Sequence, residues 1–116
     1  MPPISYDGRQ FRAVSNAPNG EVSDATRFAY RQRGDVVWAT YEGGGVRFGT
    51  RVASVDVDGV LDMRYAHVNT NGDLMTGTCR STPEVLPDGR LRLHERWRWT
   101  SGDESAGTSV VEEIAP

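Results

Sequence analysis

Glycine-containing turns recur along this chain at short intervals, and they constrain the fold more than any other feature of the sequence. They stand at Gly34, Gly43–Gly45, Val57–Gly59, Thr70–Gly72 and Pro87–Gly89. Between them lie runs of about 8 to 14 residues that are rich in Val, Thr, Tyr, Phe, Trp and Arg. This is the pattern of consecutive β-hairpins, and no run shows a competing helical periodicity.

The runs predict eight strands, and their length and order predict how these are arranged. Joined in sequence, the strands form an antiparallel up-and-down meander, which loses its two exposed edges when it closes into a barrel. We therefore predict an all-β fold, in which a single domain over residues 1–116 forms a single eight-stranded antiparallel up-and-down β-barrel. The expected strands are Arg9–Ser15, Ala25–Arg33, Val36–Glu42, Val46–Val57, Val60–Asn69, Asp73–Val85, Arg90–Thr100 and Gly107–Ile114.

Turn chemistry predicts which residues face each other in the second half of the chain. Pro87–Gly89 suits a three-residue loop, with a type I turn followed by a left-handed glycine. Three-residue loops at Thr70–Gly72 and Val57–Gly59 give the same inward face, whereas a two-residue Asn71–Gly72 loop would invert it. Arginines of these strands fall on the outer face. The inward face carries Val55, Leu61, Met63, Tyr65, His67, Met75, Cys79, Leu93, Glu95, Trp97 and Trp99.

The fourth expected strand does not alternate cleanly between apolar and polar residues. Its first part predicts that Phe48 and Val52 face inward and that Arg47 and Arg51 face outward. The turn that follows requires the opposite alternation. A β-bulge near residues 52–53 reconciles the two patterns, and this is the interpretation that we prefer. In the alternative there is no bulge, and both arginines face the lumen beside tyrosines of neighbouring strands.

Six interior residues are candidates for ligand binding. The longer loops predict a mouth at one end of the barrel, beside Tyr65, His67 and Trp99. The aromatic members either fill a small barrel or grip a flat ligand. His67 is either a satisfied core histidine or a group that binds a ligand or acts as an acid or base. The candidates are Tyr30, Tyr65, His67, Glu95, Trp97 and Trp99.

Glu95 carries a carboxylate into the apolar face of its strand. A buried carboxylate needs a partner or a raised pKa, and Ser81 is its expected cross-strand neighbour. A Glu95–His67 pair is not expected, because the register separates the two residues by roughly 20 Å along the strands. Cys79 is expected to be an inert small hydrophobe.

The composition argues against several partners and cofactors. One cysteine, with two histidines on opposite faces, does not make a metal site, so we expect no metal and no cofactor. A net charge of −3 without a basic run argues against nucleic acid. The first six residues lack the features of a secretory signal, and no stretch approaches the roughly 20 apolar residues of a membrane span. We expect a cytoplasmic location and no membrane partner. A homodimer, and an anionic partner on the outward Arg92, Arg96 and Arg98, stay open.

Several stretches resemble a group of small bacterial proteins that automated naming often calls N-acetylglutamate synthase. They include Arg12–Asn16, Met63–Tyr65, Gly72–Gly77 and Leu93–Gly102, which reads Leu-His-Glu-x-Trp-x-Trp-Thr-Ser-Gly. Acetyltransferases bind the acetyl-CoA pyrophosphate at a helix N-terminus after an Arg/Gln-x-x-Gly-x-Gly/Ala loop. The nearest segment here, Arg31–Val36, ends differently and leads into a strand, so we do not expect that activity. The predicted barrel itself resembles lipocalin/avidin-like proteins.

Three functions are compatible with these residues. The leading hypothesis is a small-molecule-binding barrel with an aromatic-lined lumen, which takes a small apolar or aromatic ligand. The second is an enzyme that uses His67 or Glu95 as a lone acid or base, although the sequence contains no complete catalytic set. The third is an interaction or structural module with a filled core. A lumen without a pocket of a few hundred Å³ would favour the third hypothesis.

Overall fold

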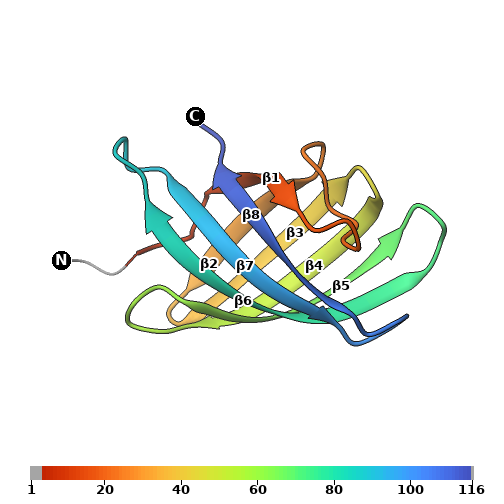
Figure 1. Cartoon of the computed structure of the whole chain (residues 1–116). Helices are drawn as coiled ribbons and strands as arrows, with labels where there is room; N and C mark the ends of the chain where they lie inside the picture. The colour runs from red at the N-terminus through yellow and green to blue at the C-terminus, as the bar shows by residue number, and fades with distance from the viewer. Residues whose placement is uncertain (1–3, 116) are drawn as a thin grey trace.

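A computed structural model describes residues 4–115, which form a closed antiparallel barrel of eight strands in sequence order (Figure 1). The predicted fold class is confirmed, and each predicted strand end lies within two residues of the observed one. None of the described residues belongs to a helix that is long and apolar enough to cross a membrane. The strands are β1 (Gln10–Asn16), β2 (Arg27–Arg33), β3 (Val36–Gly43), β4 (Val46–Val55), β5 (Leu61–Asn69), β6 (Leu74–Val85), β7 (Leu91–Trp99) and β8 (Ala106–Glu113).

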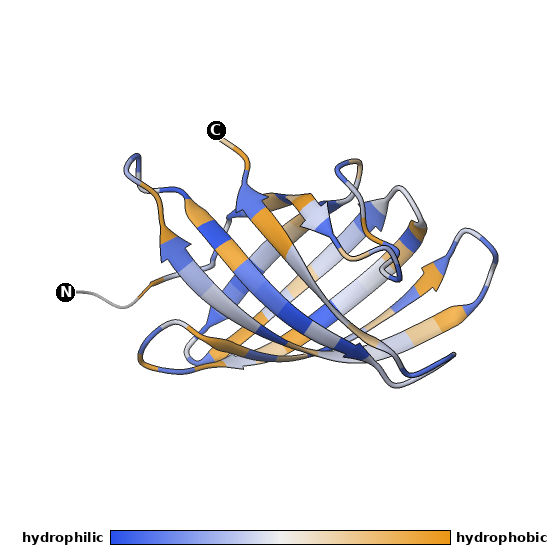
Figure 2. Ribbon diagram, in the orientation of Figure 1, coloured by the Kyte–Doolittle hydropathy of each residue, from blue (hydrophilic) through white to orange (hydrophobic). Residues whose placement is uncertain are grey.

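The predicted register of β4 to β7 is confirmed. Ser81 lies opposite Glu95, and His67 lies opposite Met75. The Asn71–Gly72 alternative is therefore wrong, because the longer loop keeps the odd-numbered residues of β5 and β6 on the inner face. Apolar and polar residues alternate along the strands in Figure 2, so that the apolar side chains pack inside the barrel while most arginines remain outside.

The preferred interpretation of β4 is wrong about the position of the bulge and about the faces of Phe48, Arg51 and Val52. The bulge lies between Val46 and Phe48 rather than near residues 52–53. From that point the strand alternates regularly, so Phe48 and Val52 face solvent, with exposed fractions of 51% and 57%. Arg51 points into the lumen and is only 6% exposed. Arg47 remains outside, as the bulge interpretation expected.

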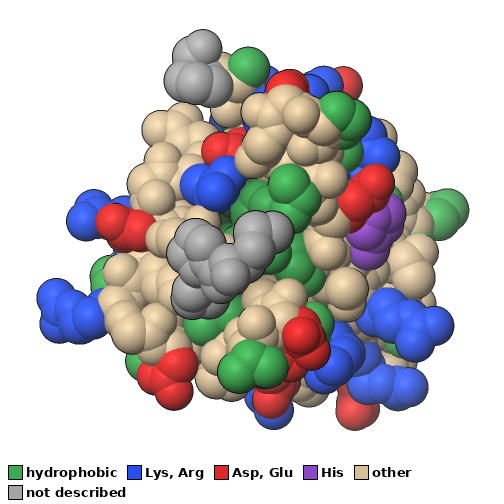
Figure 3. All heavy atoms as spheres, turned by 90° about the vertical axis from the view of Figure 1, so that its left-hand side faces the viewer, with side chains coloured by type: hydrophobic (Ala, Val, Ile, Leu, Met, Phe, Trp, Pro, Cys, Tyr) green, Lys and Arg blue, Asp and Glu red, His purple; other side chains and the backbone are tan. Residues whose placement is uncertain are grey.

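The two ends of the barrel are closed in different ways. At one end the strands are joined by tight turns, and Tyr6 from the N-terminal segment is fully buried there, where its hydroxyl donates to the Gly59 carbonyl oxygen at 2.5 Å. Figure 3 views this end, with apolar side chains at its centre and charged ones around the rim. The opposite end carries the longer loops, including residues 17–26 between β1 and β2 (Figure 1).

Candidate functional site

All six candidate residues face the barrel interior, where each is at least nine-tenths buried. They separate into two polar clusters with an aromatic group beside them. Glu95 belongs to a network in the middle of the lumen, and His67 belongs to a cluster at the mouth. No hydrogen bond joins Glu95 to His67 among the described residues, in agreement with the register. That the six residues bind a ligand stays a prediction.

The Arg51–Glu95 network provides the partner that a buried carboxylate requires. Arg51 Nη1 donates to Glu95 Oε2 at 2.8 Å and to the Tyr30 hydroxyl at 3.1 Å. The hydroxyls of Ser81 and Ser109 donate to the two carboxylate oxygens at 3.2 and 3.3 Å. Glu95 thus has three hydrogen-bond donors and an opposite charge, the partners that offset the cost of burying a carboxylate.

The guanidinium of Arg51 is held by aromatic rings as well as by Glu95. It lies 4.5 Å from the ring centre of Phe28 and 5.2 Å from that of Tyr41, within the range of cation–π attraction. Burial by itself lowers the pKa of Arg51. The charge of Glu95, with smaller contributions from groups such as Tyr30, outweighs burial and raises that pKa above its usual value. The lumen therefore contains a buried ion pair between Arg51 and Glu95.

The mouth cluster consists of Glu21, Tyr41, His67 and Asn69. Glu21 Oε1 lies 2.7 Å from His67 Nε2, and Glu21 Oε2 accepts from Asn69 Nδ2 at 2.9 Å. On the other side of the imidazole, Nδ1 lies 2.7 Å from the Tyr41 hydroxyl. An ionised carboxylate can only accept, so Nε2 carries a proton and donates to Glu21. In the neutral ring, Nδ1 then accepts from Tyr41.

Gly49 makes room for the contact between Tyr41 and His67. It lies on β4 directly between them, opposite Tyr41 on one side and His67 on the other. A Cβ atom at this position would lie 2.5 Å from Tyr41 Cζ and 2.6 Å from His67 Cβ. Only glycine allows the phenol and the imidazole to meet across this strand.

The β1–β2 loop, residues 17–26, covers the mouth and brings Glu21 into it. Trp99 Nε1 donates to the Asn19 carbonyl oxygen at 3.1 Å, and Asn16 Nδ2 donates to the Val22 carbonyl oxygen at 2.8 Å. Val22 is partly buried against the core. Ala17 packs there as well, and Asn19 Nδ2 donates to the Ala106 carbonyl oxygen at 3.0 Å. The loop is thus attached to the barrel by separate hydrogen bonds and two small apolar contacts, in contrast to the continuous ladders of the strands.

A small cavity remains beneath the loop, with a volume of about 20 Å³. A space of this size holds about one water molecule. Within the described part of the chain, buried side chains pack around this cavity. Residues that line the cavity include Glu21, Arg51, Tyr65, His67, Trp97 and Trp99.

A comparison with known protein families identifies the kind of barrel. A profile described as "Avidin-like protein" matches residues 4–114, nearly the whole chain. The chain belongs to the avidin-like family. No curated protein and no solved structure matches it significantly. The predicted resemblance of the barrel to avidin-like proteins is thus confirmed, while the resemblance to proteins named N-acetylglutamate synthase stays a prediction. In this avidin-like barrel the Arg31–Val36 segment forms the end of β2, a tight turn and the start of β3.

Besides the two serines that bind Glu95, four residues of the two clusters were absent from the predicted set or left open in it. Tyr41 and Asn69 follow the alternation of β3 and β5, and could have been found from that pattern. Arg51 was hidden by the misplaced bulge. Glu21 lies in a loop without periodicity, so the sequence contains no signal that would bring it to His67.

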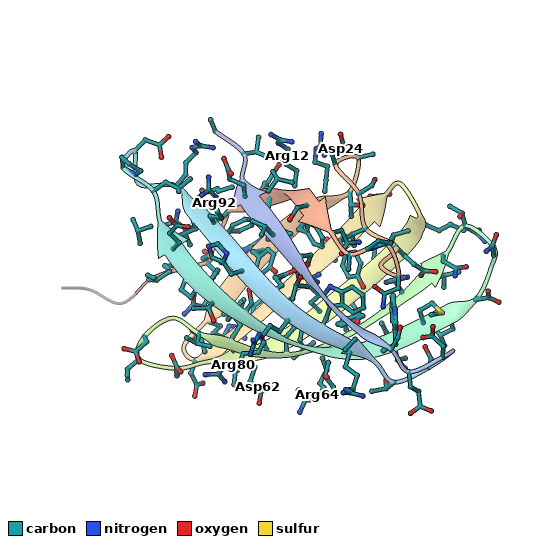
Figure 4. The ribbon with its side chains drawn as sticks, in the orientation of Figure 1. Arg12, Asp24, Asp62, Arg64, Arg80 and Arg92 are labelled. Carbon is teal, nitrogen blue, oxygen red and sulfur yellow. The ribbon has the colours of Figure 1, made fainter. Side chains whose placement is uncertain are left out.

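The outer face of the avidin-like barrel carries the arginines for which an anionic partner was considered. Arg92 is bound to Glu84 and Glu112, so part of its charge is already neutralised. Arg96 lies directly opposite Arg80, where two like charges meet across β6 and β7. Figure 4 shows Arg80 at the barrel surface, on the side that also carries Asp62 and Arg64, and Asp62 lies directly opposite Arg80 on β5. Docking of an anionic partner here stays a prediction.

Cys79 is buried opposite Trp97, as predicted. Burial and, to a smaller extent, the charge of Glu95 raise the pKa of its thiol far above the usual value. Since the thiolate is the nucleophile, we expect no reaction with a thiol reagent at pH 8 in the folded protein and rapid reaction after denaturation in urea. Time-resolved labelling followed by mass spectrometry measures both rates, and comparable rates would contradict this result.

Metal binding receives no geometric support within the described part of the chain. No group of three or more His, Cys, Asp or Glu side chains is placed there to hold an ion. His94 points outward and hydrogen-bonds Glu84 at 2.9 Å. It therefore lies on the opposite side of the barrel wall from the mouth cluster.

Proposed function

We propose that this avidin-like barrel binds a small molecule at the mouth of its lumen, between Tyr65, Trp97 and Trp99. One observation carries the proposal: Arg51 lines the cavity, and its buried Nε has no hydrogen-bond partner among the described residues. An unsatisfied buried donor costs about 1–3 kcal/mol, and an acceptor on a ligand would remove that cost. The three aromatic side chains would supply flat apolar walls.

Binding requires the β1–β2 loop to withdraw, because the closed cavity has room for about one water molecule. The loop is suited to this movement. It is held by separate hydrogen bonds, most of them made by side chains, whereas the residues beneath it are held by strand ladders on both sides. Loops with few buried contacts open at a much lower free energy than the core of the protein.

An interaction or structural module with a filled lumen is the second candidate, and the small cavity favours it. The polar content of the lumen argues against it. A well-packed apolar core is commonly as stable as one that contains a buried ion pair, so a purely structural role gives no reason for the Arg51–Glu95 network. The enzyme hypothesis has less support, because both nitrogens of His67 are hydrogen-bonded and Glu95 is paired with Arg51.

Native mass spectrometry of protein purified from its own host tests the proposal. The expected result is a species heavier than the chain by the mass of one small molecule, which disappears after denaturation and refolding. A Trp38→Phe variant provides a second readout. Trp38 alternates with the inward residues of β3 and does not line the lumen, so in this variant all tryptophan fluorescence comes from Trp97 and Trp99. Their emission should change when the released molecule is added back. Protein that carries no ligand, with emission insensitive to extracts of the host, would favour the filled module.

A further inference from the structure

We propose that the ligand of the lumen is a carboxylate, and that Glu21 holds the place of its carboxylate group in the closed barrel. This inference rests on the proposed function and specifies the chemistry of the same site. It follows from three features of the barrel. At the mouth, two side chains form a receptor and donate to the two oxygens of one carboxylate, and a loop residue, Glu21, supplies that carboxylate. Deeper in the lumen, Arg51 has a donor without a partner among the described residues.

The receptor consists of His67 and Asn69, which donate to different oxygens of one carboxylate at 2.7 and 2.9 Å. Both residues are more than nine-tenths buried and occupy successive inward positions of β5. Both are also oriented by other bonds. Tyr41 holds the far nitrogen of His67, and the backbone N–H groups of Asn71 and Asp73 donate to Asn69 Oδ1, which leaves Nδ2 directed at the mouth. The receptor therefore does not depend on the loop.

Glu21 is the movable part of this arrangement. Its side chain is 26% exposed, and it reaches the receptor from the β1–β2 loop. Withdrawal of Glu21 into water would leave the donors of His67 and Asn69 buried without an acceptor, which costs the full desolvation of both groups. A ligand carboxylate restores both hydrogen bonds, whereas a neutral amide offers one acceptor oxygen for two donors. The site thus favours carboxylates over neutral molecules of the same shape.

The deeper part of the lumen indicates what the rest of the ligand contains. Tyr65, Trp97 and Trp99 line the cavity next to the receptor, and Trp99 lies 5.7 Å from the His67 ring. Arg51 lines the same cavity, and its buried Nε has no partner among the described residues. An aromatic carboxylate with a second hydrogen-bond acceptor on its ring would satisfy the receptor, the aromatic walls and Arg51 together.

A Glu21→Gln variant separates this inference from the proposed function. The probes are benzoate, 4-hydroxybenzoate and the neutral isostere benzamide, and NMR signals of the His67 ring and the Trp99 indole N–H report on binding. Asp24→Asn is the matched control, because Asp24 is an exposed acid of the same loop (Figure 4). The introduced amide offers only one acceptor oxygen to the two donors, so Glu21→Gln should bind both carboxylates at least tenfold more tightly than the wild type and Asp24→Asn do. Benzamide should gain much less.

The outcomes distinguish the carboxylate inference from small-molecule binding in general. Equal gains for benzamide and benzoate would overturn the carboxylate inference while leaving small-molecule binding intact. No perturbation of either signal by any probe, in any variant, would overturn the carboxylate inference, whereas the absence of a retained molecule in native mass spectrometry would overturn the proposed function. A second variant serves if Glu21→Gln changes the fold: Asn69→Asp in the wild-type chain places a negative charge in the receptor, and it should abolish carboxylate binding but retain binding of benzamide.

Discussion

Replacement of Arg51 by methionine is expected to destabilise the folded protein by about 3–5 kcal/mol. The guanidinium lies 2.8 Å from Glu95, and the side chains of both residues are almost completely buried. Methionine fills a similar volume but leaves the Glu95 carboxylate without an opposite charge. The Tyr30 hydroxyl also loses its donor. The cost therefore comes mainly from an uncompensated buried charge rather than from lost packing.

Urea denaturation of the variant and of matched controls measures this effect. Arg64→Met is the first control, because Arg64 and Asp62 are also 2.8 Å apart but are exposed; its expected cost is below about 1 kcal/mol. The second is Arg51→Met combined with Glu95→Gln, which removes both charges and should recover part of the stability. A cost for Arg51→Met no larger than for Arg64→Met would mean that the buried pair does not stabilise the fold.

The sequence predicted the second half of the barrel down to individual residue pairs. Three-residue loops at Thr70–Gly72 and Pro87–Gly89 determine the parity of the strands on each side, and both hairpins place the same residues of β6 on one face. Two independent turns thus agreed on a single register. A one-residue error would have turned every apolar side chain outward, so the hydrophobic pattern checked the result.

The position of Arg51 was missed because the local pattern of β4 favours the wrong face. Phe48 and Val52 are apolar and Arg51 is charged, so alternation alone turns the arginine outward. A bulge is a property of the backbone and has no strong sequence signature. The missing information was on another strand: an inward Glu95 requires a cation, and this requirement favours the alternative in which Arg51 faces the lumen.

The location of Glu21 has a different explanation. Its loop contains Pro18 and Gly20 and has no alternation from which a direction could be derived. Hydrogen bonds from Asn16 and Trp99 determine where this loop lies. They depend on the assembled barrel, so the contact between Glu21 and His67 is visible only in the three-dimensional structure.

Alkaline conditions are expected to unfold this protein in one steep step between about pH 11 and pH 12. The four tyrosines of the chain, Tyr6, Tyr30, Tyr41 and Tyr65, are all buried. Burial is the largest cause that raises each of their pKa values above the usual range. In the unfolded chain a tyrosine has a pKa of about 10. Below that pH both states keep their phenol protons, and the tyrosines add no pH dependence.

Above pH 10 only the unfolded chain releases these protons, so stability falls as the pH rises. Each tyrosine contributes a loss of about 1.4 kcal/mol per pH unit, and four lower the free energy of unfolding by about 6 kcal/mol at pH 11 and about 11 kcal/mol at pH 12. A domain of this size has a stability of roughly 5–15 kcal/mol. Far-UV circular dichroism and tyrosinate absorbance should therefore change together.

A Tyr65→Phe variant tests the cause of this transition. None of the hydrogen bonds described for the barrel involves the Tyr65 hydroxyl, so the variant should keep most of its stability at neutral pH. Above pH 10 its free energy of unfolding should fall less steeply than that of the wild type, by about 1.4 kcal/mol per pH unit. It should therefore unfold at a higher pH than a wild-type protein of the same stability at neutral pH would. Gradual ionisation near pH 10 in a barrel that stays folded would mean that the phenols are open to solvent. It would also contradict the tight packing of the aromatic side chains in the lumen.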